Sequence, residues 1–383
     1  MANKFGEAIS IIREAFHEPE AFIPLHEPRF IGNEKRYVLD AIDSTFVSSV
    51  GKYVDTFEKM MGEMTGAKFA IATVNGTAAL HIALLIAGVK NGDEVITQPI
   101  TFVATSNAIS YCGAGLAFVD VDLDTMGMSP ASLEAFLTKH CEKKDGGIFN
   151  KSTGRRIAAC VPMHTFGMPC HIEKIAEICE LFGVPLVEDS AESLGSYYNG
   201  KHTGTFGELG IFSFNGNKTI TSGGGGAIVT DDEQLAKLAK HITTTAKIPH
   251  KWEYEHDMVG YNYRMPNLNA ALACAQLEKL NFFIENKREL AAHYNEVFPK
   301  IGIPFTTEIE RAKANYWLMV VRLQDEAEKN QFLQETNGSK VMTRPIWRLL
   351  NKLPMYNNSF CMPLSNSLEL EATVVNIPSS ARI

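Results

Sequence analysis

The stretch IFSFNGNKTITSGGGGAIVT, residues 211–230, indicates both a fold and a chemistry. An apolar segment typical of a buried strand leads to Ser213 and Lys218, and four glycines follow at 223–226. A desolvated lysine can attack a carbonyl group, and glycines let the backbone pass close to a bulky ring. Taken alone, Lys218 could also be a solvated turn lysine, and the glycines a flexible hairpin or nucleotide loop. A P-loop is excluded because the lysine precedes the glycines and no GKS or GKT occurs.

A second stretch, PLVEDSAESLGS at 185–196, places acidic residues directly after an apolar segment. In open α/β sheets the carboxyl ends of the strands border the ligand site. A carboxylate there, such as Asp189, can keep a pyridine nitrogen protonated, which lets pyridoxal phosphate (PLP) accept electrons. A surface pair of acids beyond the strand is an equally good interpretation of this stretch alone.

A third stretch, NGTAALHIALL at 75–85, follows the short apolar strand FAIATV. The free backbone N–H groups and the dipole at such a helix start form an anion site that suits phosphate. Gly76 permits close approach and Thr77 supplies a hydroxyl. The competing interpretation is that Asn75 or Thr77 simply caps the helix.

The order of the patterns along the chain predicts an α/β protein with a largely parallel sheet, because short apolar strands alternate with helices from about residue 33. Residues 266–298 form one long helical pattern of the kind that commonly bridges two domains. After Pro299 the pattern changes to that of a smaller α+β domain. We expect an N-terminal segment (1–34) that packs with the small domain, a large α/β domain (35–270), and a small domain that includes the bridging helix (271–383).

Composition narrows the function further. The 383 residues carry a formal net charge of −8, with Lys and Arg scattered among acids, which argues against nucleic acid as a partner. Seven cysteines show no C-x-x-C spacing, so neither disulfides nor a metal site is indicated. The sequence begins without the apolar core of a signal peptide and has no apolar run long enough to span a membrane. A cytoplasmic protein with reduced thiols and no membrane partner is expected.

The three stretches in this order, with GDEVITQPITFVAT, GYNYRMPNLNAALACAQLE and NIPSSARI, resemble the DegT-type sugar-nucleotide aminotransferases across nearly the whole chain. These are fold-type I PLP enzymes. The resemblance implies a large domain with a mostly parallel seven-stranded sheet between helices, and a smaller α+β C-terminal domain. One departure is Gly224, where many relatives carry an acid.

The resemblance also implies roles for individual residues. Lys218 would form the Schiff base with PLP, and Asp189 would pair with the pyridine nitrogen. Relatives that dehydrate their substrates replace this lysine with histidine, so Lys218 favours amino transfer. Asn262 would reach the cofactor phosphate of the partner subunit, which makes a homodimer with shared active sites obligatory. The remaining cofactor-binding residues implied are Gly76, Thr77, Ala78 and Ser213 at the phosphate, Phe102 stacked on the ring, and Glu192 near the ring hydroxyl and substrate.

For the substrate, the segment MTRPIWRLLNKLPMY (342–356) offers Arg344, Trp347 and Arg348 to phosphates and a flat base or sugar, although a packed loop explains it nearly as well. His164, His202 and Tyr316 are further candidates for the sugar site, with Glu192. The segment and the glycine run look most like enzymes that aminate UDP-4-keto-6-deoxy-N-acetylglucosamine, with glutamate as amino donor, for bacillosamine or legionaminic-type sugars.

Three alternatives are weighed against this interpretation. The first is an aminotransferase for another nucleotide keto sugar, of the perosamine or 3-amino type. The second is a PLP-binding regulator without turnover, which the absence of a recognisable helix-turn-helix disfavours. The third is a Rossmann-type oxidoreductase, which is rejected because FAIATVNGTAAL lacks the G-x-G-x-x-G pattern.

Overall fold

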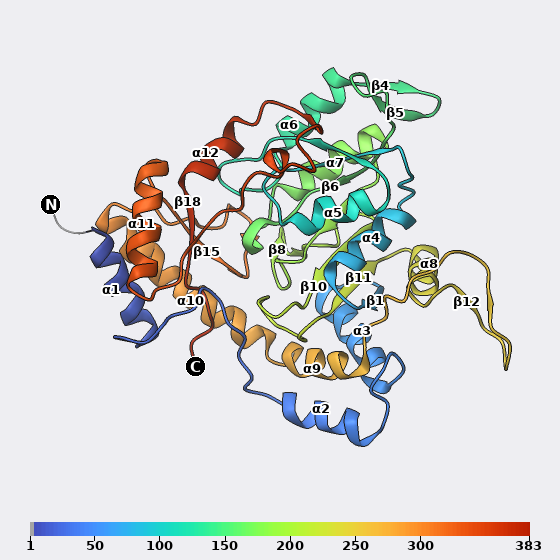
Figure 1. Cartoon of the computed structure of the whole chain (residues 1–383), viewed down its shortest axis with the longest axis horizontal. Coiled ribbons are helices and arrows are strands. Elements are labelled where there is room, and N and C mark those ends of the chain that lie inside the picture. The colour runs from blue at the N-terminus through green and yellow to red at the C-terminus, as the bar shows by residue number, and fades with distance from the viewer. Residues whose placement is uncertain (1–3) are drawn as a thin grey trace.

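The fold is described from a computed structural model, which describes residues 4–383 (Figure 1). Its centre is a sheet in two four-stranded halves, in the orders β1-β11-β10-β7 and β17-β3-β2-β6. Parallel bridges from Cys160 to Leu186 and from Met163 to Asp189 join β6 to β7. The strands are β1 (Phe69–Thr73), β2 (Glu94–Thr97), β3 (Gly115–Phe118), β6 (Ile157–Val161), β7 (Val187–Asp189), β10 (Leu209–Ser213), β11 (Gly226–Thr230) and β17 (Phe360–Cys361).

All neighbouring strands of this sheet run parallel except β11, which is antiparallel to both β1 and β10. The predicted mostly parallel α/β sheet is therefore confirmed, with β17 as an eighth strand beside the seven that were expected. The two-residue strand β17, from the C-terminal part of the chain, extends its edge beside β3.

Helices cover both faces of the sheet because successive strand residues point to opposite sides. Ile71 packs with one helical layer and Ala72 with the other. The first layer holds α4 (Gly76–Ile86), α5 (Val103–Tyr111) and α8 (Glu233–Thr243). The second holds α3 (Lys52–Thr65), α6 (Pro130–Ala135), α7 (Ile172–Phe182) and α9 (Asn267–Leu277). We call this sheet and its helices the large lobe.

A small lobe lies at the other end of the molecule, on the left in Figure 1, around the antiparallel sheet β15-β18-β16. Its core joins Phe5 and Ile12 near the start of the chain to Phe332 and Val375 near its end. It comprises α1 (Lys4–Phe16), α10 (Leu280–Val297), β15 (Met319–Arg322), α11 (Glu326–Gly338), β16 (Arg344–Pro345), α12 (Ser365–Thr373) and β18 (Val374–Ile377). The predicted domain boundaries stay a prediction, and Leu350 and Tyr356 return to the large-lobe core.

The single helix predicted over 266–298 is two helices, α9 and α10. The break falls at residues 278–279, between the end of α9 and the start of α10, and at Lys279 φ is −108° and ψ is 0°. At this break, the Glu278 carboxylate accepts hydrogen bonds from the side chains of Asn33 and Tyr37. Figure 1 shows the pair running along the lower side of the molecule from the large lobe to the small one.

Smaller elements decorate this frame. Helix α2 (Glu34–Asp43) lies on α9, and a two-stranded arm, β12 (Lys247–Ile248) with β13 (Glu255–His256), projects from the large lobe (Figure 1). Two further small sheets pair β4 (Cys141–Lys144) with β5 (Gly147–Asn150), and β14 (Ala312–Lys313) with β8 (Tyr197–Tyr198) and β9 (Lys201–His202). Among residues 4–383, no helix combines the length and the apolar character needed to cross a membrane.

Candidate active site

Most of the predicted site residues meet in a cavity of about 650 Å³ between the two lobes. On the large-lobe side the cavity begins where β7 and β10 end, at Asp189 and Ser213, and where α4 starts. On the small-lobe side its wall is formed by Trp317, Leu318, residues 344–348 and Asn376. The predicted residues that line it are Gly76, Thr77, Phe102, Asp189, Glu192, Ser213, Lys218, Arg344 and Trp347, with Arg348.

The start of α4 is built as an anion cradle. Asn75 is extended, with φ −167° and ψ 169°, and its side-chain oxygen accepts a hydrogen bond from the Ala78 N–H at 2.8 Å. The helix-cap interpretation of Asn75 is thus correct, and the Ala78 N–H already has a partner. Gly76 packs so tightly on β10 that a Cβ there would lie 2.8 Å from the Cβ of Ser213. The close approach brings the Ser213 side chain to the helix start, as a phosphate site between them requires.

Asp189 is buried at the end of β7 and accepts two hydrogen bonds. The Thr105 hydroxyl donates to its Oδ2 at 2.7 Å, and the Ala191 N–H donates to its Oδ1 at 3.2 Å. Burial raises the pKa of the Asp189 carboxyl, while the hydrogen bond from Thr105 opposes that rise. A protonated pyridine nitrogen would supply the positive partner that this buried carboxylate favours. The cradle and the carboxylate therefore fit the two ends of PLP.

Lys218 lies between an acid and an aromatic ring. Its Nζ donates to Glu192 Oε1 at 3.1 Å and lies 3.9 Å from the centre of the Trp317 ring. Burial raises the pKa of the Glu192 carboxyl, and the nearby Lys218 lowers it. The Trp317 indole N–H donates to the Asn217 carbonyl at 2.6 Å, which fixes the turn that carries Lys218. The lysine is thus held at the cavity floor with its side chain only 12% exposed.

Aromatic side chains form the cavity mouth. Phe102, at the residue before α5, is 50% exposed and lies 6.4 Å from Trp347 between ring centres. Trp347 in turn lies 4.7 Å from Phe166. An open ring face at Phe102 suits the predicted stacking on a flat cofactor ring, which stays a prediction.

The other predicted substrate residues lie outside the cavity lining. His164 is fully buried between Glu188, 3.0 Å from its Nε2, and Cys170. His202 is buried and accepts from the Gly195 N–H at 2.8 Å. Tyr316 is buried beside Arg288, and its hydroxyl accepts from the Glu308 N–H at 3.3 Å. These polar groups already have partners inside the protein, which is the usual state of buried polar side chains.

Asn262 is exposed, and its backbone bridges to Thr244 near the base of the arm. It does not line the cavity of its own chain. Its predicted role in a partner's site therefore stays a prediction.

Thr105, Trp317 and Asn376 also line the cavity and were not predicted. Thr105 is the last residue of the segment TFVAT (101–105), and its spacing from Phe102 is the sequence pattern from which it could have been predicted. Trp317 and Asn376 stand about 100 and 160 residues beyond Lys218, and no local pattern links them to it.

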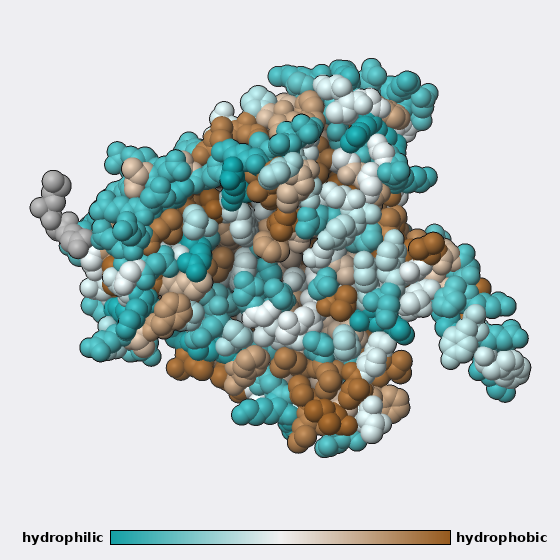
Figure 2. Space-filling model, viewed as in Figure 1, coloured by the Kyte–Doolittle hydropathy of each residue, from teal (hydrophilic) through white to brown (hydrophobic). Residues whose placement is uncertain are grey.

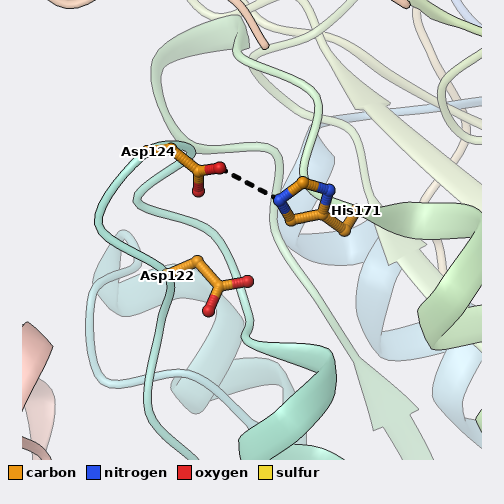
Figure 3. A group of neighbouring side chains, drawn as sticks. All are labelled: Asp122, Asp124 and His171. Carbon is orange, nitrogen blue, oxygen red and sulfur yellow. Dashed lines mark hydrogen bonds and ion pairs between the residues drawn. The ribbon is translucent and has the colours of Figure 1, made fainter. Parts of the chain in front are cut away.

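A separate group of side chains contains potential metal ligands. Asp122, Asp124 and His171 each bring one ligand atom within 4.8 Å of the others (Figure 3). His171 Nε2 lies 3.1 Å from Asp124 Oδ2, an ion pair that accounts for the approach of these two side chains. One exposed and two half-buried ligands do not by themselves make a metal site. The expectation of no metal remains untested.

The sequence profile of the DegT/DnrJ/EryC1/StrS aminotransferase family matches residues 29–383. The GDP-perosamine synthase of Escherichia coli O157:H7 is 36% identical over 359 residues, 94% of this chain and 93% of that protein. EpsN of Bacillus subtilis (strain 168), named provisionally as a pyridoxal phosphate-dependent aminotransferase, is 37% identical over 336 residues, 88% of this chain and 84% of that protein. The crystal structure of the aminotransferase TlmJ from Streptoalloteichus hindustanus matches with a TM-score of 0.85 at 25% identity, over 94% of both chains.

Proposed function

Because the chain belongs to the DegT/DnrJ/EryC1/StrS aminotransferase family, we propose that it transfers an amino group from glutamate to the keto group of a GDP-linked sugar. It is an enzyme, a PLP-dependent sugar aminotransferase, and not the regulator without turnover. The expected UDP-4-keto-6-deoxy-N-acetylglucosamine gives way to the alternative of the perosamine type. Three relatives that are 32–36% identical over 93–94% of this chain are named GDP-perosamine synthase.

The observation that carries the proposal is the placement of Lys218 above the buried carboxylates of one cavity. When bound, PLP supplies an electron sink that stabilises the charge left at the carbon that loses its proton. With PLP bound, Asp189 would hold the proton of the ring nitrogen, and Gly76, Thr77 and Ser213 would receive the phosphate. Lys218 Nζ removes and returns the proton at the reacting carbon, and Glu192 orients this amine.

The substrate would lie between these residues and the small-lobe wall. Arg344 donates hydrogen bonds to two uncharged oxygens, the side-chain oxygen of Asn337 and the Thr343 carbonyl. In the described residues, neither Arg344 nor Arg348 forms an ion pair with an acid. Two guanidinium groups without acidic partners suit the diphosphate of a nucleotide sugar. Trp347 offers an aromatic surface to the base or the sugar.

We expect the working unit to be a homodimer whose subunits share their active sites. Leu39, Ile42, Phe46 and Val50 are exposed around α2 and form an apolar face, visible as the brown area at the lower edge of Figure 2. The projecting arm also exposes two large aromatic side chains, Trp252 and Tyr254. Exposed apolar surface of this extent favours a protein partner, and a second copy would cover it. Mixing inactive Lys218→Ala and Asn262→Ala subunits should restore part of the activity if sites are shared.

The decisive experiment combines a spectrum with a panel of substrates. Purified enzyme should absorb in the near-visible, and Lys218→Ala should lose both this band and turnover. With glutamate as donor, turnover should be fastest with a GDP-linked 4-keto-6-deoxy sugar and slower with UDP-linked 4-keto-6-deoxy-N-acetylglucosamine. Faster turnover of the UDP sugar would refute the choice of nucleotide sugar. Retention of the band and turnover by Lys218→Ala would refute the role of the lysine.

A further inference from the structure

Asn376 is a polar residue inside an apolar strand. It lies in β18, the central strand of the small-lobe sheet, paired with Val320 on one side and Arg344 on the other. The rest of this strand, Val374, Val375 and Ile377, is fully buried and apolar. The side chain of Asn376 lines the cavity and is only 3% exposed.

The amide nitrogen of Asn376 has no partner. Its Nδ2 is buried, and no hydrogen-bond acceptor among residues 4–383 lies within reach of its N–H groups. Leaving such a donor unpaired costs folding free energy, and most buried amides do find a partner. An apolar residue at this position would stabilise the fold more than asparagine does. A ligand that completes the hydrogen bonds of the amide best explains why asparagine is present.

The position of Asn376 selects the kind of ligand. The residues assigned to the cofactor lie on the large-lobe wall and floor, whereas Asn376 lies on the small-lobe wall beside Leu318 and residues 344–348. The arginines there suit anionic groups of the substrate. A neutral amide can both donate and accept, which matches a hydroxyl group.

We propose that Asn376 binds a hydroxyl group of the substrate's sugar ring and helps to determine which sugars the enzyme accepts. The inference rests on the proposed function, since it requires a nucleotide sugar in this cavity. Asn376 is a specificity residue in this proposal and takes no part in proton transfer. It should therefore matter to the sugar half of the reaction and not to the glutamate half.

The test uses Asn376→Leu, which keeps the volume and removes both polar atoms. The variant should fold, with a melting temperature at or above that of the wild type, because an unpaired buried donor is gone. Stopped-flow absorbance follows each half-reaction of the holoenzyme separately. The glutamate half should keep its rate, and kcat/KM for the keto sugar should fall roughly twofold to tenfold, as expected for one neutral hydrogen bond.

A binding measurement gives a second readout. Calorimetry with GDP alone should give equal affinity for wild type and Asn376→Leu, whereas the GDP-linked amino sugar should bind the variant more weakly. Asn351→Ala is the matched control, because Asn351 also has an unpartnered buried amide atom but lies outside the cavity lining. It should leave both half-reactions unchanged.

Several results would overturn the inference. A slower glutamate half-reaction with an intact sugar half would assign Asn376 to the amino donor. Equal loss of affinity for GDP would assign it to the nucleotide, and unchanged sugar kinetics or a lower melting temperature would make it structural. If the wild type itself neither turned over nor bound any nucleotide sugar, the proposed function would fail first, and this inference with it.

Discussion

Replacing Thr105 with valine should weaken the hold of the enzyme on the ring proton of its cofactor. The Thr105 hydroxyl donates the shorter of the two hydrogen bonds that Asp189 accepts, 2.7 Å against 3.2 Å from the Ala191 N–H. Valine has nearly the same shape but cannot donate. Asp189 would keep one hydrogen bond in a buried site where its ionised form is already disfavoured.

The magnitude follows from the value of a hydrogen bond to a charged group, about 1.5–3 kcal/mol. At about 1.36 kcal/mol per pH unit, the acidic limb of the kcat/KM profile should move upward by about one to two pH units. The direction is fixed because losing the donor further disfavours the ionised carboxylate, so activity is lost at a higher pH than in the wild type. Near the acidic limb kcat/KM should fall by roughly tenfold or more.

The assay is transamination with glutamate from pH 5 to pH 9, with cofactor content measured by absorbance. Thr101→Val is the matched control, since the Thr101 hydroxyl lies 2.7 Å from that of Thr105 but does not contact Asp189. An unchanged acidic limb in Thr105→Val, with normal cofactor content, would refute the reasoning. So would an equal displacement in both variants.

Three further predictions concern stability. Burial raises the pKa of Asp189, so the ionised carboxylate destabilises the cofactor-free fold at high pH. Cofactor-free Asp189→Asn should therefore have a higher melting temperature than wild type at pH 8. This difference should vanish as the pH falls through the raised pKa of Asp189. Gly226→Ala should cost about 1–3 kcal/mol, because its Cβ would lie 2.5 Å from the Asn75 carbonyl, whereas Gly224→Ala, with 3.8 Å to the nearest atom, should melt like wild type. Asn75→Ala removes the cap on the Ala78 N–H and should cost about 0.5–2 kcal/mol by chemical denaturation. Equal melting temperatures of Asp189→Asn and wild type at pH 8, or of Gly226→Ala and Gly224→Ala, would contradict the first two predictions. An unchanged denaturation midpoint for Asn75→Ala would contradict the third.

The sequence predicted the parts of the site that depend on local order. Asp189 and Ser213 are the last residues of buried strands, and Gly76 starts a helix after one, so the sheet brings all three to one edge. The lysine turn follows for the same reason.

Residue type alone could not place the side chains that depend on distant packing. His164 resembles a ligand-binding histidine in sequence, yet Glu188 and Cys170 enclose it. Trp317 reaches the lysine turn from another lobe, which no spacing rule reveals.

The small lobe joins the first helix of the chain to its last strand, and this has a consequence for biosynthesis. The ribosome releases α1 first, yet the partners of its apolar side, such as Phe332 and Leu370, are made more than 300 residues later. All strands of the large-lobe sheet except β17 are complete by residue 230. The strands behind the large-lobe wall of the cavity are therefore made midway through translation, while the apolar side of α1 still lacks its partners. The small-lobe wall of the cavity is completed last, when β18 enters its sheet.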